Sequence, residues 1–324
     1  MRIETFTKAL IALGTLCIGS ATAQNFPLKP IRMLAPEAGG GVDFVARMIA
    51  REMSASFGQQ VVIDNRGGAG GTLGMGRVAK TVPDGYTIAV WHIAHATAPA
   101  LYENLKYNPL DDFDHIGRIT DVPMTLVSKT ALPTKTVGEI IQWMKTQNAK
   151  ATYGHAGTGS ASHLCALLLM NRLGIQMTGV PFRGTGPAMN DLIGGQFDVM
   201  CDQTTGTTNQ IKDGKIKGYA VTTLTKVSSL PDLPTLDQSG MKGFEVSAWH
   251  AMWAPKGLPK EATDKLVSAL QAALKDPKVV DRFASLGTEP VAPELATPTA
   301  LRSQLASELT KWQTVIKSAG VKGE

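Results

Sequence analysis

The sequence predicts an α/β protein built from two lobes. Apolar runs with strand character alternate with runs of helical periodicity, and the alternation occurs in two successive series. Glycine accounts for 33 residues while aromatic residues make up only 6% of the chain, which suits tight strand-to-helix turns better than an all-β sandwich. The 324 residues exceed the usual size of one domain, so two lobes are expected.

The first series begins with a buried strand at residues 31–35. Glycines end this strand, and a helix is expected over residues 43–57, where apolar residues recur at helical spacing and Gly58 supplies the stop. The next strand is expected at 60–64. A glycine-dense turn, NRGGAGGTLGMG, then leads into another helix, and residues 86–91 are again strand-like.

The second series repeats this order. A strand at 151–155, a loop and a helix closed by Gly174 come first, and a helix beginning at Pro187 follows later. Further strands are expected at 179–182, 196–201 and 216–222. The C-terminal region is expected to be helical and to carry one apolar stripe, formed by Leu301, Leu305, Leu309, Trp312 and Ile316. Alternating strands and helices predict parallel pairing, with ligand loops at the carboxyl ends of the strands.

The first 23 residues have the three parts of a secretory signal peptide. Two basic residues precede an apolar run at 9–18, and Ala21-Thr22-Ala23 is a typical cleavage site. This run is too short to span a bilayer, and no later run approaches about 20 apolar residues. We therefore expect export from the cytoplasm and a soluble mature chain.

Charge and cysteine content indicate which ligands the chain favours and how its cysteines are used. Loss of the leader lowers the formal net charge from +5 to +4, a mild excess that favours acidic over cationic ligands. No basic run with interleaved aromatic residues indicates nucleic-acid binding. The mature chain keeps Cys165 and Cys201, which we expect to be two small buried side chains, with one disulfide as the alternative.

Two glycine-rich loops carry the main functional signal. PEAGGGVD (residues 36–43, the first loop) and HAGTGSASH (residues 155–163, the second loop) each connect a predicted strand to a predicted helix. Unpaired N–H groups and the helix dipole make such a position an anion site, and Thr158, Ser160 and Ser162 add hydroxyl donors. If both loops face one cleft, they clamp an anion between the lobes. A tight turn without a ligand is the alternative for either loop alone.

Three charged residues near the loops each have two interpretations. Glu37 is expected to point to solvent, or else to accept hydrogen bonds from a hydroxyl, an amine or a protonated group of the ligand. Asp43 is most simply the N-cap of the first helix. Arg183 either pairs with a carboxylate or lies on the surface.

The sequence contains no clear catalytic or metal-binding constellation. His92 and His95 form an H-x-x-H pair without a third ligand nearby, so zinc is not expected. There is no G-x-S-x-G nucleophile elbow and no P-loop, and no cofactor is expected. The alternative from another class is a secreted hydrolase that uses a serine of the second loop with His155 or His163.

Longer stretches of the chain resemble one family. The stretches are KPIRML…PDGYTI from Lys29 to Ile88, YNPLDDFDHIGRI, YGHAGTGSASHL, VPFRGTGPAMNDLIGGQFDVMCD, YAVTT followed by LPDLPTLDQSG, and KWQTVIKSAGVK. They are similar to the tripartite tricarboxylate transporter solute-binding proteins, also called Bug-type receptors. Together they cover almost all of the mature chain in order, and NRGGAGG…PDGYT is highly specific.

The resemblance implies a type II periplasmic binding protein, with two lobes that each contain a central mixed sheet flanked by helices and with a ligand cleft between them. Residues 24–122 and 226–324 are expected to form lobe I, and residues 123–225 to form lobe II. The implied function is a monomeric periplasmic receptor that closes on a small carboxylate and presents it to the permease subunits of a tripartite tricarboxylate transporter.

The resemblance also implies a set of site residues. In such receptors, backbone amides, hydroxyls and bridging waters from one loop of each lobe hold the carboxylate, and the outer cleft reads the second functional group. The expected ligand-binding residues are Pro36, Glu37, Ala38, Gly39, Gly40, Asp43, His92, Thr158, Gly159, Ser160, Ser162, Phe182, Arg183, Gly184, Thr185 and Asp202.

The chain departs from the family pattern in the first loop and on a later strand. The family usually has an aromatic residue in place of Pro36, small residues or proline in place of Glu37 and Ala38, and glycine in place of Ala251. These departures leave the identity of the ligand open.

Two ligand classes remain. His92 stands where the cleft wall is expected, and together with Trp91 and Phe182 it is placed to stack on an aromatic acid such as terephthalate. An aliphatic di- or tricarboxylate is the equal alternative. A receptor that reports to a membrane signalling protein uses the same cleft and remains an alternative to transport.

Overall fold

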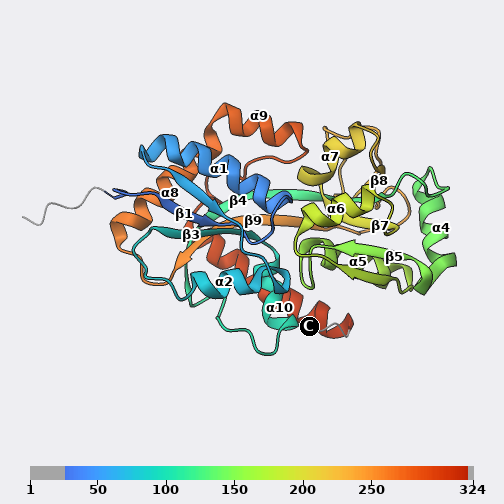
Figure 1. Cartoon of the computed structure of the whole chain (residues 1–324), viewed down its shortest axis with the longest axis horizontal. Helices are drawn as coiled ribbons and strands as arrows, with labels where there is room; N and C mark the ends of the chain where they lie inside the picture. Colours follow the sequence, from blue (N-terminus) through green and yellow to red (C-terminus); the bar gives the residue numbers. More distant parts are fainter. Residues whose placement is uncertain (1–25, 320–324) are drawn as a thin grey trace, which may run out of the picture.

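The computed structural model describes residues 26–319, and the predicted signal peptide lies outside the described residues. Two lobes lie side by side along the longest axis, each with helices packed around a sheet (Figure 1). The sheets share the long strand β4 (Phe113–Ser128), and the strand order is β2-β1-β3-β9-β4-β7-β5-β6, with β8 also paired to β4. This arrangement confirms the predicted α/β fold with a mixed sheet in each lobe.

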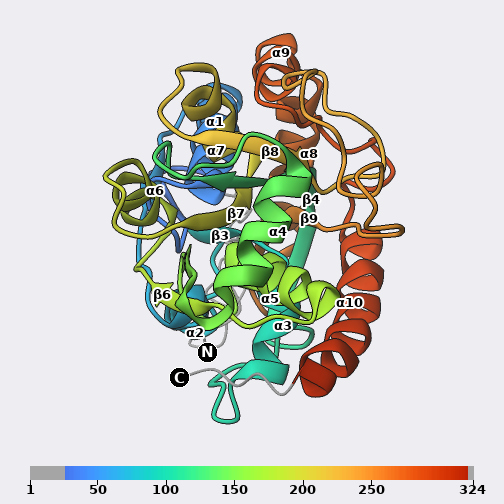
Figure 2. The ribbon, with the colours of Figure 1, turned by 90° about the vertical axis from the view of Figure 1, so that its right-hand side faces the viewer.

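Lobe I is built on the first part of β4 and on β1 (Ile31–Leu34), β2 (Val61–Asp64), β3 (Thr87–His92) and β9 (Ser247–Pro255). β1 pairs in parallel with β2 and β3, whereas β9 runs antiparallel to β3 and β4. The helices of this lobe are α1 (Gly41–Phe57), α2 (Thr72–Val78), α3 (Ala94–Leu101), α8 (Lys260–Lys275), α9 (Pro277–Ser285) and α10 (Pro298–Ala319). α10 runs along one side of the molecule and packs on α3 and β4 (Figure 2).

Lobe II is built on the end of β4 and on β5 (Thr152–His155), β6 (Thr178–Pro181), β7 (Val199–Gln203) and β8 (Lys217–Val221). β5 pairs in parallel with β6 and β7, and β4 runs antiparallel to β7 and β8. The helices are α4 (Val137–Gln147), α5 (Ala161–Leu173), α6 (Thr185–Ile193) and α7 (Thr204–Lys212). Short 3₁₀ turns occupy Ala69–Gly71 in lobe I and Asn148–Lys150 in lobe II.

The chain passes between the lobes at two adjacent places. Residues 113–123 of β4 pair with β9, while residues 124–128 pair with β7 and β8. The return runs between β8 and β9, where Thr222 N donates to Met124 O (2.9 Å) and Val246 N donates to Thr222 O (3.1 Å). The two connecting segments are therefore joined by hydrogen bonds next to each other.

The predicted elements agree with the structure where a local pattern defines them. Gly58 (φ 63°) ends α1 and Gly174 (φ 65°) ends α5, both in the left-handed conformation that glycine favours. β4 and β9 were not predicted. β4 is buried along nearly its whole length and so shows no alternation, and Pro123 inside it is a signal against a strand. Alternation of strands and helices alone predicted parallel pairing, but β4 and β9 run antiparallel to their neighbours, in keeping with the mixed sheets that the family resemblance implies.

The two cysteines form a disulfide, so the expectation of two separate buried side chains is wrong. Cys165 lies in α5 and Cys201 in β7, with Cα atoms 5.9 Å apart. The two cysteines are 36 positions apart in the sequence, and no local pattern indicates their contact. It arises because α5 packs on β7 within lobe II.

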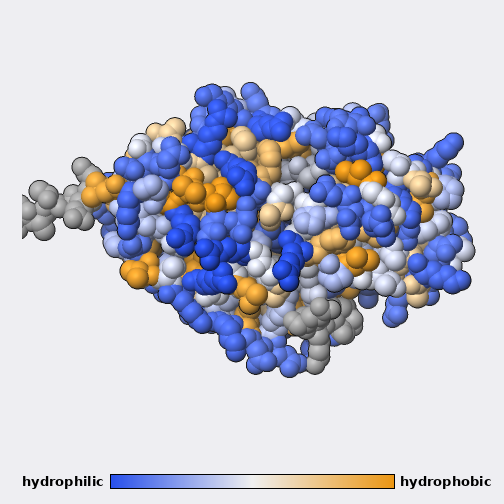
Figure 3. All heavy atoms as spheres, in the orientation of Figure 1, coloured by the Kyte–Doolittle hydropathy of each residue, from blue (hydrophilic) through white to orange (hydrophobic). Residues whose placement is uncertain are grey.

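Within residues 26–319, no helix combines the length and apolar character that crossing a membrane requires. Hydrophilic residues cover most of the face shown in Figure 3, and hydrophobic residues form only small separate patches there.

Candidate functional site

A cavity of about 260 Å³ lies where the two lobes meet. Lobe I contributes part of the first loop, the turn at 68–71 and one aromatic residue, and lobe II contributes part of the second loop and the connection from β6 to α6. The lining residues are Pro36, Glu37, Gly68, Ala69, Gly70, Gly71, Tyr102, Ala156, Gly157, Thr158, Pro181, Phe182, Arg183 and Gly184.

The lobes touch directly around this cavity. Tyr102 Oη donates to the carbonyl oxygen of Thr158 (2.8 Å), and Gly186 N donates to Ala38 O (3.3 Å). A Cβ atom at Gly70 would overlap the carbonyl oxygen of Thr158, and Gly70 has a φ of +59°. Position 70 therefore requires glycine, because a larger residue would clash and would be strained at this φ. The contacts between the lobes show that they are in a closed arrangement.

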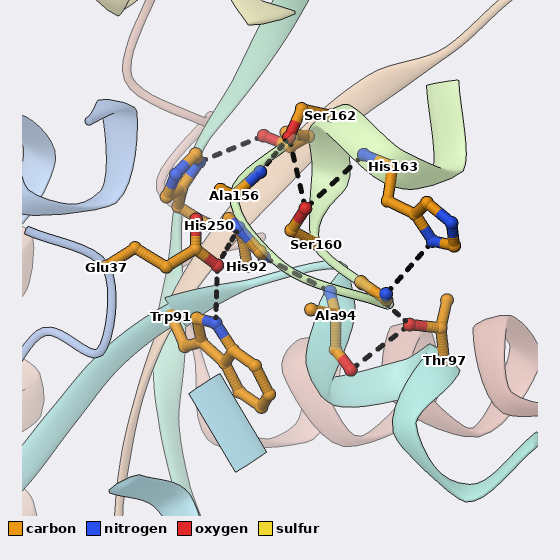
Figure 4. A network of polar contacts seen from close by, with 12 residues as sticks. Glu37, Trp91, His92, Ala94, Thr97, Ala156, Ser160, Ser162, His163 and His250 are labelled. Carbon is orange, nitrogen blue, oxygen red and sulfur yellow. Dashed lines mark hydrogen bonds and ion pairs between the residues drawn. The ribbon is translucent and has the colours of Figure 1, made fainter. Parts of the chain in front are cut away.

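Glu37 is buried, with 3% of its surface exposed, so the expectation that it points to solvent is wrong. Trp91 Nε1 donates to Glu37 Oε1 (3.3 Å), and His92 Nε2 lies 2.8 Å from the same oxygen (Figure 4). His92 Nδ1 accepts the N–H of Ala94 (3.2 Å), which assigns the ring proton to Nε2. The hydrogen bond from Trp91 and the close contact with His92, both on β3, thus fix the carboxylate at the wall of the cavity.

Asp43 is not the N-cap of α1. Gly40 holds that position without a side-chain bond, and Asp43 is the third residue of the helix. Its Oδ2 accepts the N–H of Gly39 (3.1 Å), and its Oδ1 accepts from Asn65 Nδ2 (3.0 Å). The carboxylate therefore reaches back to brace the first loop instead of facing a ligand.

The polar side chains of the second loop are used within the loop itself (Figure 4). Ser160 is the N-cap of α5 and accepts the N–H of His163 (3.3 Å), and Ser162 Oγ accepts the N–H of Ala156 (2.9 Å). The two hydroxyls also contact each other at 3.1 Å. His163 Nδ1 accepts the N–H of Gly159 (3.1 Å). These bonds hold the loop in shape.

The main-chain amides at the tip of the same loop are not used in this way. The N–H groups of Gly157 and Thr158 donate to no other group of residues 26–319, and both residues line the cavity. Gly184, the N-cap of α6, also lines it, so the positive end of one helix dipole lies at the cavity. The cavity thus combines free donors with a helix N-terminus.

Asp202 lies near the end of β7, with its side chain 1% exposed. Its Oδ2 accepts no hydrogen bond from residues 26–319. Burial raises the pKa of this carboxyl to about 8; the N–H of Gln203 opposes the change and the negative charge of Glu37 adds to it. Asp202 is therefore mainly a neutral acid at pH 7 in this closed structure.

Two buried histidines near the loops are neutral. Burial lowers the pKa of His163 to about 3, with a further contribution from His155. Burial also lowers the pKa of His250 well below its ordinary value, with a further contribution from His92. A neutral His163 suits its role as a hydrogen-bond acceptor for Gly159.

The structure brings only part of the predicted site to the cavity surface. Six predicted residues line it: Pro36, Glu37, Thr158, Phe182, Arg183 and Gly184. The other predicted residues are not part of the lining: Ala38, Gly39, Gly40, Asp43, His92, Gly159, Ser160, Ser162, Thr185 and Asp202. Trp91 and His92 are fully buried, so of the three side chains expected to stack on an aromatic acid only Phe182 faces the cavity.

Several lining residues were not predicted. The turn at 68–71 lies within the NRGGAGG run, whose density of glycine was the available signal. Gly157 belongs to the second loop, but the sequence favours the hydroxyl residues after it as ligand donors. No local sequence pattern marks Tyr102 as a lining residue, because its position depends on how α3 packs.

Residues 26–319 contain no group of three or more histidine, cysteine, aspartate or glutamate side chains placed to hold an ion. The arrangement of the cavity is suited to binding an anion through the main chain.

Comparison with known proteins decides the family. The sequence profile described as "Tripartite tricarboxylate transporter family receptor" matches residues 45–321. The chain belongs to this family. A UPF0065 protein from the TAR-I ttuE-ttuC' intergenic region of Agrobacterium vitis is 49% identical over 314 residues, which are 96% of this chain and 91% of that protein.

Solved structures of similar proteins confirm the fold of this family receptor. The periplasmic binding protein BugD is 47% identical with a TM-score of 0.90, covering 92% of this chain and all of that chain. MatC of Rhodopseudomonas palustris with bound malate is 37% identical with a TM-score of 0.86, covering 90% of this chain and all of that chain. The assignment to the Bug-type receptors, which the sequence predicted, is confirmed.

Proposed function

We propose that this tripartite tricarboxylate transporter family receptor captures a small organic carboxylate between its lobes in the periplasm and delivers it to the membrane subunits of a transporter, without covalent chemistry. The signal peptide at 1–23 directs its export. Lobe I comprises residues 24–122 and 226–324, lobe II comprises residues 123–225, and the segments that join them act as the hinge.

The observation that carries the proposal is the set of unused donors in the closed cavity. The amides of Gly157 and Thr158 and the helix N-terminus at Gly184 supply partial positive charge without a counter-ion. A hydrogen bond to a charged acceptor contributes about 1.5–3 kcal/mol, so a few of them support micromolar binding, about −8 kcal/mol, after the costs of association.

The cavity favours a small ligand that carries a hydrogen-bond donor as well as a carboxylate. Its volume of about 260 Å³ is below the usual range for drug-sized ligands. Glu37 places a carboxylate at one wall, and a hydroxyl of the ligand is the natural partner for it. MatC, with its bound malate, supports a hydroxy-dicarboxylate as the first candidate.

The hydrolase alternative is less well supported by the geometry. Ser160 Oγ is committed to the N–H of His163 and to Ser162 Oγ, and His163 Nδ1 accepts an amide proton from Gly159. The lowered pKa of His163, about 3, makes it a poor general base near neutral pH.

A thermal-melt panel tests the proposal. Malate, succinate, citrate, adipate and terephthalate are added separately to the mature protein, and an acid that binds the native state must raise Tm by mass action. A rise with at least one acid, together with no turnover of a chromogenic ester, is the expected result. A shift by a sugar or a cation but by no carboxylate would refute the proposal.

A further inference from the structure

A second and larger hollow lies on lobe I beside the cavity. This outer groove has a volume of about 820 Å³ and lies between α2 and the segment 101–106 that follows α3. It is lined by Ala69, Thr72, Leu73, Gly76, Arg77, Lys80, Leu101, Tyr102, Glu103, Asn104, Leu105 and Lys106. Ala69 and Tyr102 also line the cavity, so the two spaces share a wall.

The outer groove is basic, and its cations are available. Arg77, Lys80 and Lys106 are exposed, and their side chains form no ion pair or hydrogen bond with any group of residues 26–319. Glu103 is the one acidic residue of the lining. Three cations against one acid leave an excess of positive charge on this surface.

The cavity, unlike the outer groove, has no excess of positive side chains in its lining to attract an anionic ligand. Its charged lining side chains are Glu37, which is buried, and Arg183, which is exposed. The amides of Gly157 and Thr158 attract an anion only at short range, because they are neutral dipoles. The opposite charges of Glu37 and Arg183 offset each other, so a net long-range attraction must come from full charges outside the cavity, since these act over about 10 Å at 0.1 M salt.

We propose that the outer groove is an encounter site for the anionic ligand, where a carboxylate is held transiently by Arg77, Lys80 and Lys106 before it enters the cavity. This inference rests on the proposed function and adds to it how the acid is captured. The ligand class is an organic anion with at least one free carboxylate.

Tyr102 forms the gate between the two spaces. It lines both of them, and its hydroxyl donates to the carbonyl oxygen of Thr158 in lobe II (2.8 Å). Opening of the lobes breaks this bond and joins the groove to the cavity. Closure re-forms it and separates the bound acid from the groove.

The experiment compares association rates of two charge-reversal variants. The test variant is R77E/K80E/K106E, and the matched control is K145E/K150E/K212E, which makes the same change in net charge at exposed lysines of lobe II. Association with malate, or with the tightest-binding acid of the melt panel if malate does not bind, is followed by stopped-flow tryptophan fluorescence. Circular dichroism and Tm confirm that both variants fold.

We expect the association rate constant of the test variant to fall about 10-fold or more below that of the control at low salt. The dissociation rate constant should stay within about twofold, and the difference in association should disappear near 0.5 M salt. A glutamine variant at the same three positions should show a smaller loss in association rate.

Equal association rates for the test and control variants would overturn the encounter site while leaving the proposed function intact. A loss confined to the dissociation rate would also overturn it, because the groove would then hold the bound acid instead of guiding it. Failure of the unmodified protein to bind any acid of the panel is a different result, which refutes the proposed function itself.

Discussion

The two glycine-rich loops differ in what they show to the cavity. The first loop presents a charged side chain, Glu37, which Trp91 and His92 of β3 hold in place. The second loop turns its serines and His163 inward to fix its own shape and leaves the amides of Gly157 and Thr158 unused. Similar composition therefore serves two purposes: one loop offers an acceptor and the other offers donors.

This difference indicates how such a site gains specificity. Main-chain amides donate to any carboxylate of suitable size, because they recognise its charge and shape and not the rest of the ligand. A fixed acceptor such as Glu37 distinguishes acids by their second group, since it favours a hydroxyl and repels another carboxylate.

The largest expected effect is a loss of ligand affinity when the contact between the turn at 68–71 and the second loop is disrupted. Gly70→Ala should weaken malate binding by at least about 100-fold, or about 3 kcal/mol, because the new methyl group overlaps the carbonyl oxygen of Thr158 and the lobes cannot close. Isothermal titration calorimetry measures the affinity.

Gly58→Ala is the matched control for Gly70→Ala. Gly58 has a similar φ of +63°, but a Cβ atom there meets nothing within 4 Å. This change should cost about 1 kcal/mol of stability and leave malate affinity unaltered. Equal losses of affinity in the two variants would mean that backbone strain, and not the contact with Thr158, explains the effect.

The next largest effect is on the pH dependence of stability, through Asp202. Glu37 of the first loop contributes to the raised pKa of this residue. A carboxyl with a pKa of about 8 in the folded state and 3.8 in the unfolded state favours folding fully below pH 3.8, and this contribution is lost as pH rises toward 8. Relative to Asp202→Asn, the unmodified protein should therefore lose roughly 2–3 kcal/mol between pH 5 and 7.

Urea unfolding of both proteins at several pH values measures this difference. The buried histidines with lowered pKa values, such as His163, lose their contribution as pH falls below 6.5, but they are the same in both proteins and cancel in the difference. A gap that stays constant with pH would show that Asp202 is ionised in the folded state.

Substitution of Glu37 is expected to have a smaller effect, on stability and on the choice between ligands. Glu37→Ala leaves the Trp91 N–H buried without its acceptor and removes the contact with His92, and should lower the free energy of unfolding by about 1–3 kcal/mol. Glu37→Gln keeps an acceptor oxygen and should retain most of this stability while reducing the preference for malate over succinate. An unchanged malate-to-succinate ratio in Glu37→Gln would remove Glu37 from ligand discrimination.

The smallest effect is expected at the second loop. Ser160→Ala removes the N-cap of α5 and should cost about 1 kcal/mol of stability in chemical denaturation. Malate affinity should fall only a few-fold, because the hydroxyl shapes the loop and does not line the cavity. A drop of about 100-fold without loss of stability would instead place the hydroxyl on the ligand.

The sequence predicted those features that a local pattern determines. Helical periodicity and stop glycines located α1 and α5, and glycine density located both loops. Features that depend on packing were missed or misjudged. The burial of Glu37 requires Trp91 and His92 from a strand more than 50 positions away, and the Cys165–Cys201 bond requires α5 to lie on β7.

The lining of the cavity was predicted only in part for the same reason. Hydroxyl residues such as Ser160 were expected to be ligand donors because of their chemistry, but the loop uses them to satisfy its own backbone. The contribution of Tyr102 follows from the packing of α3 against the second loop, which no sequence spacing reveals.

A crystal structure of the mature protein with bound malate, or with the acid that raises Tm most, will show which groups hold the carboxylate. We expect a carboxylate in the cavity, with its oxygens about 2.7–3.2 Å from the amide nitrogens of Gly157 and Thr158 and with the lobes closed. A carboxylate bound outside this cavity, or held by the Ser160 and Ser162 hydroxyls in place of these amides, would contradict it.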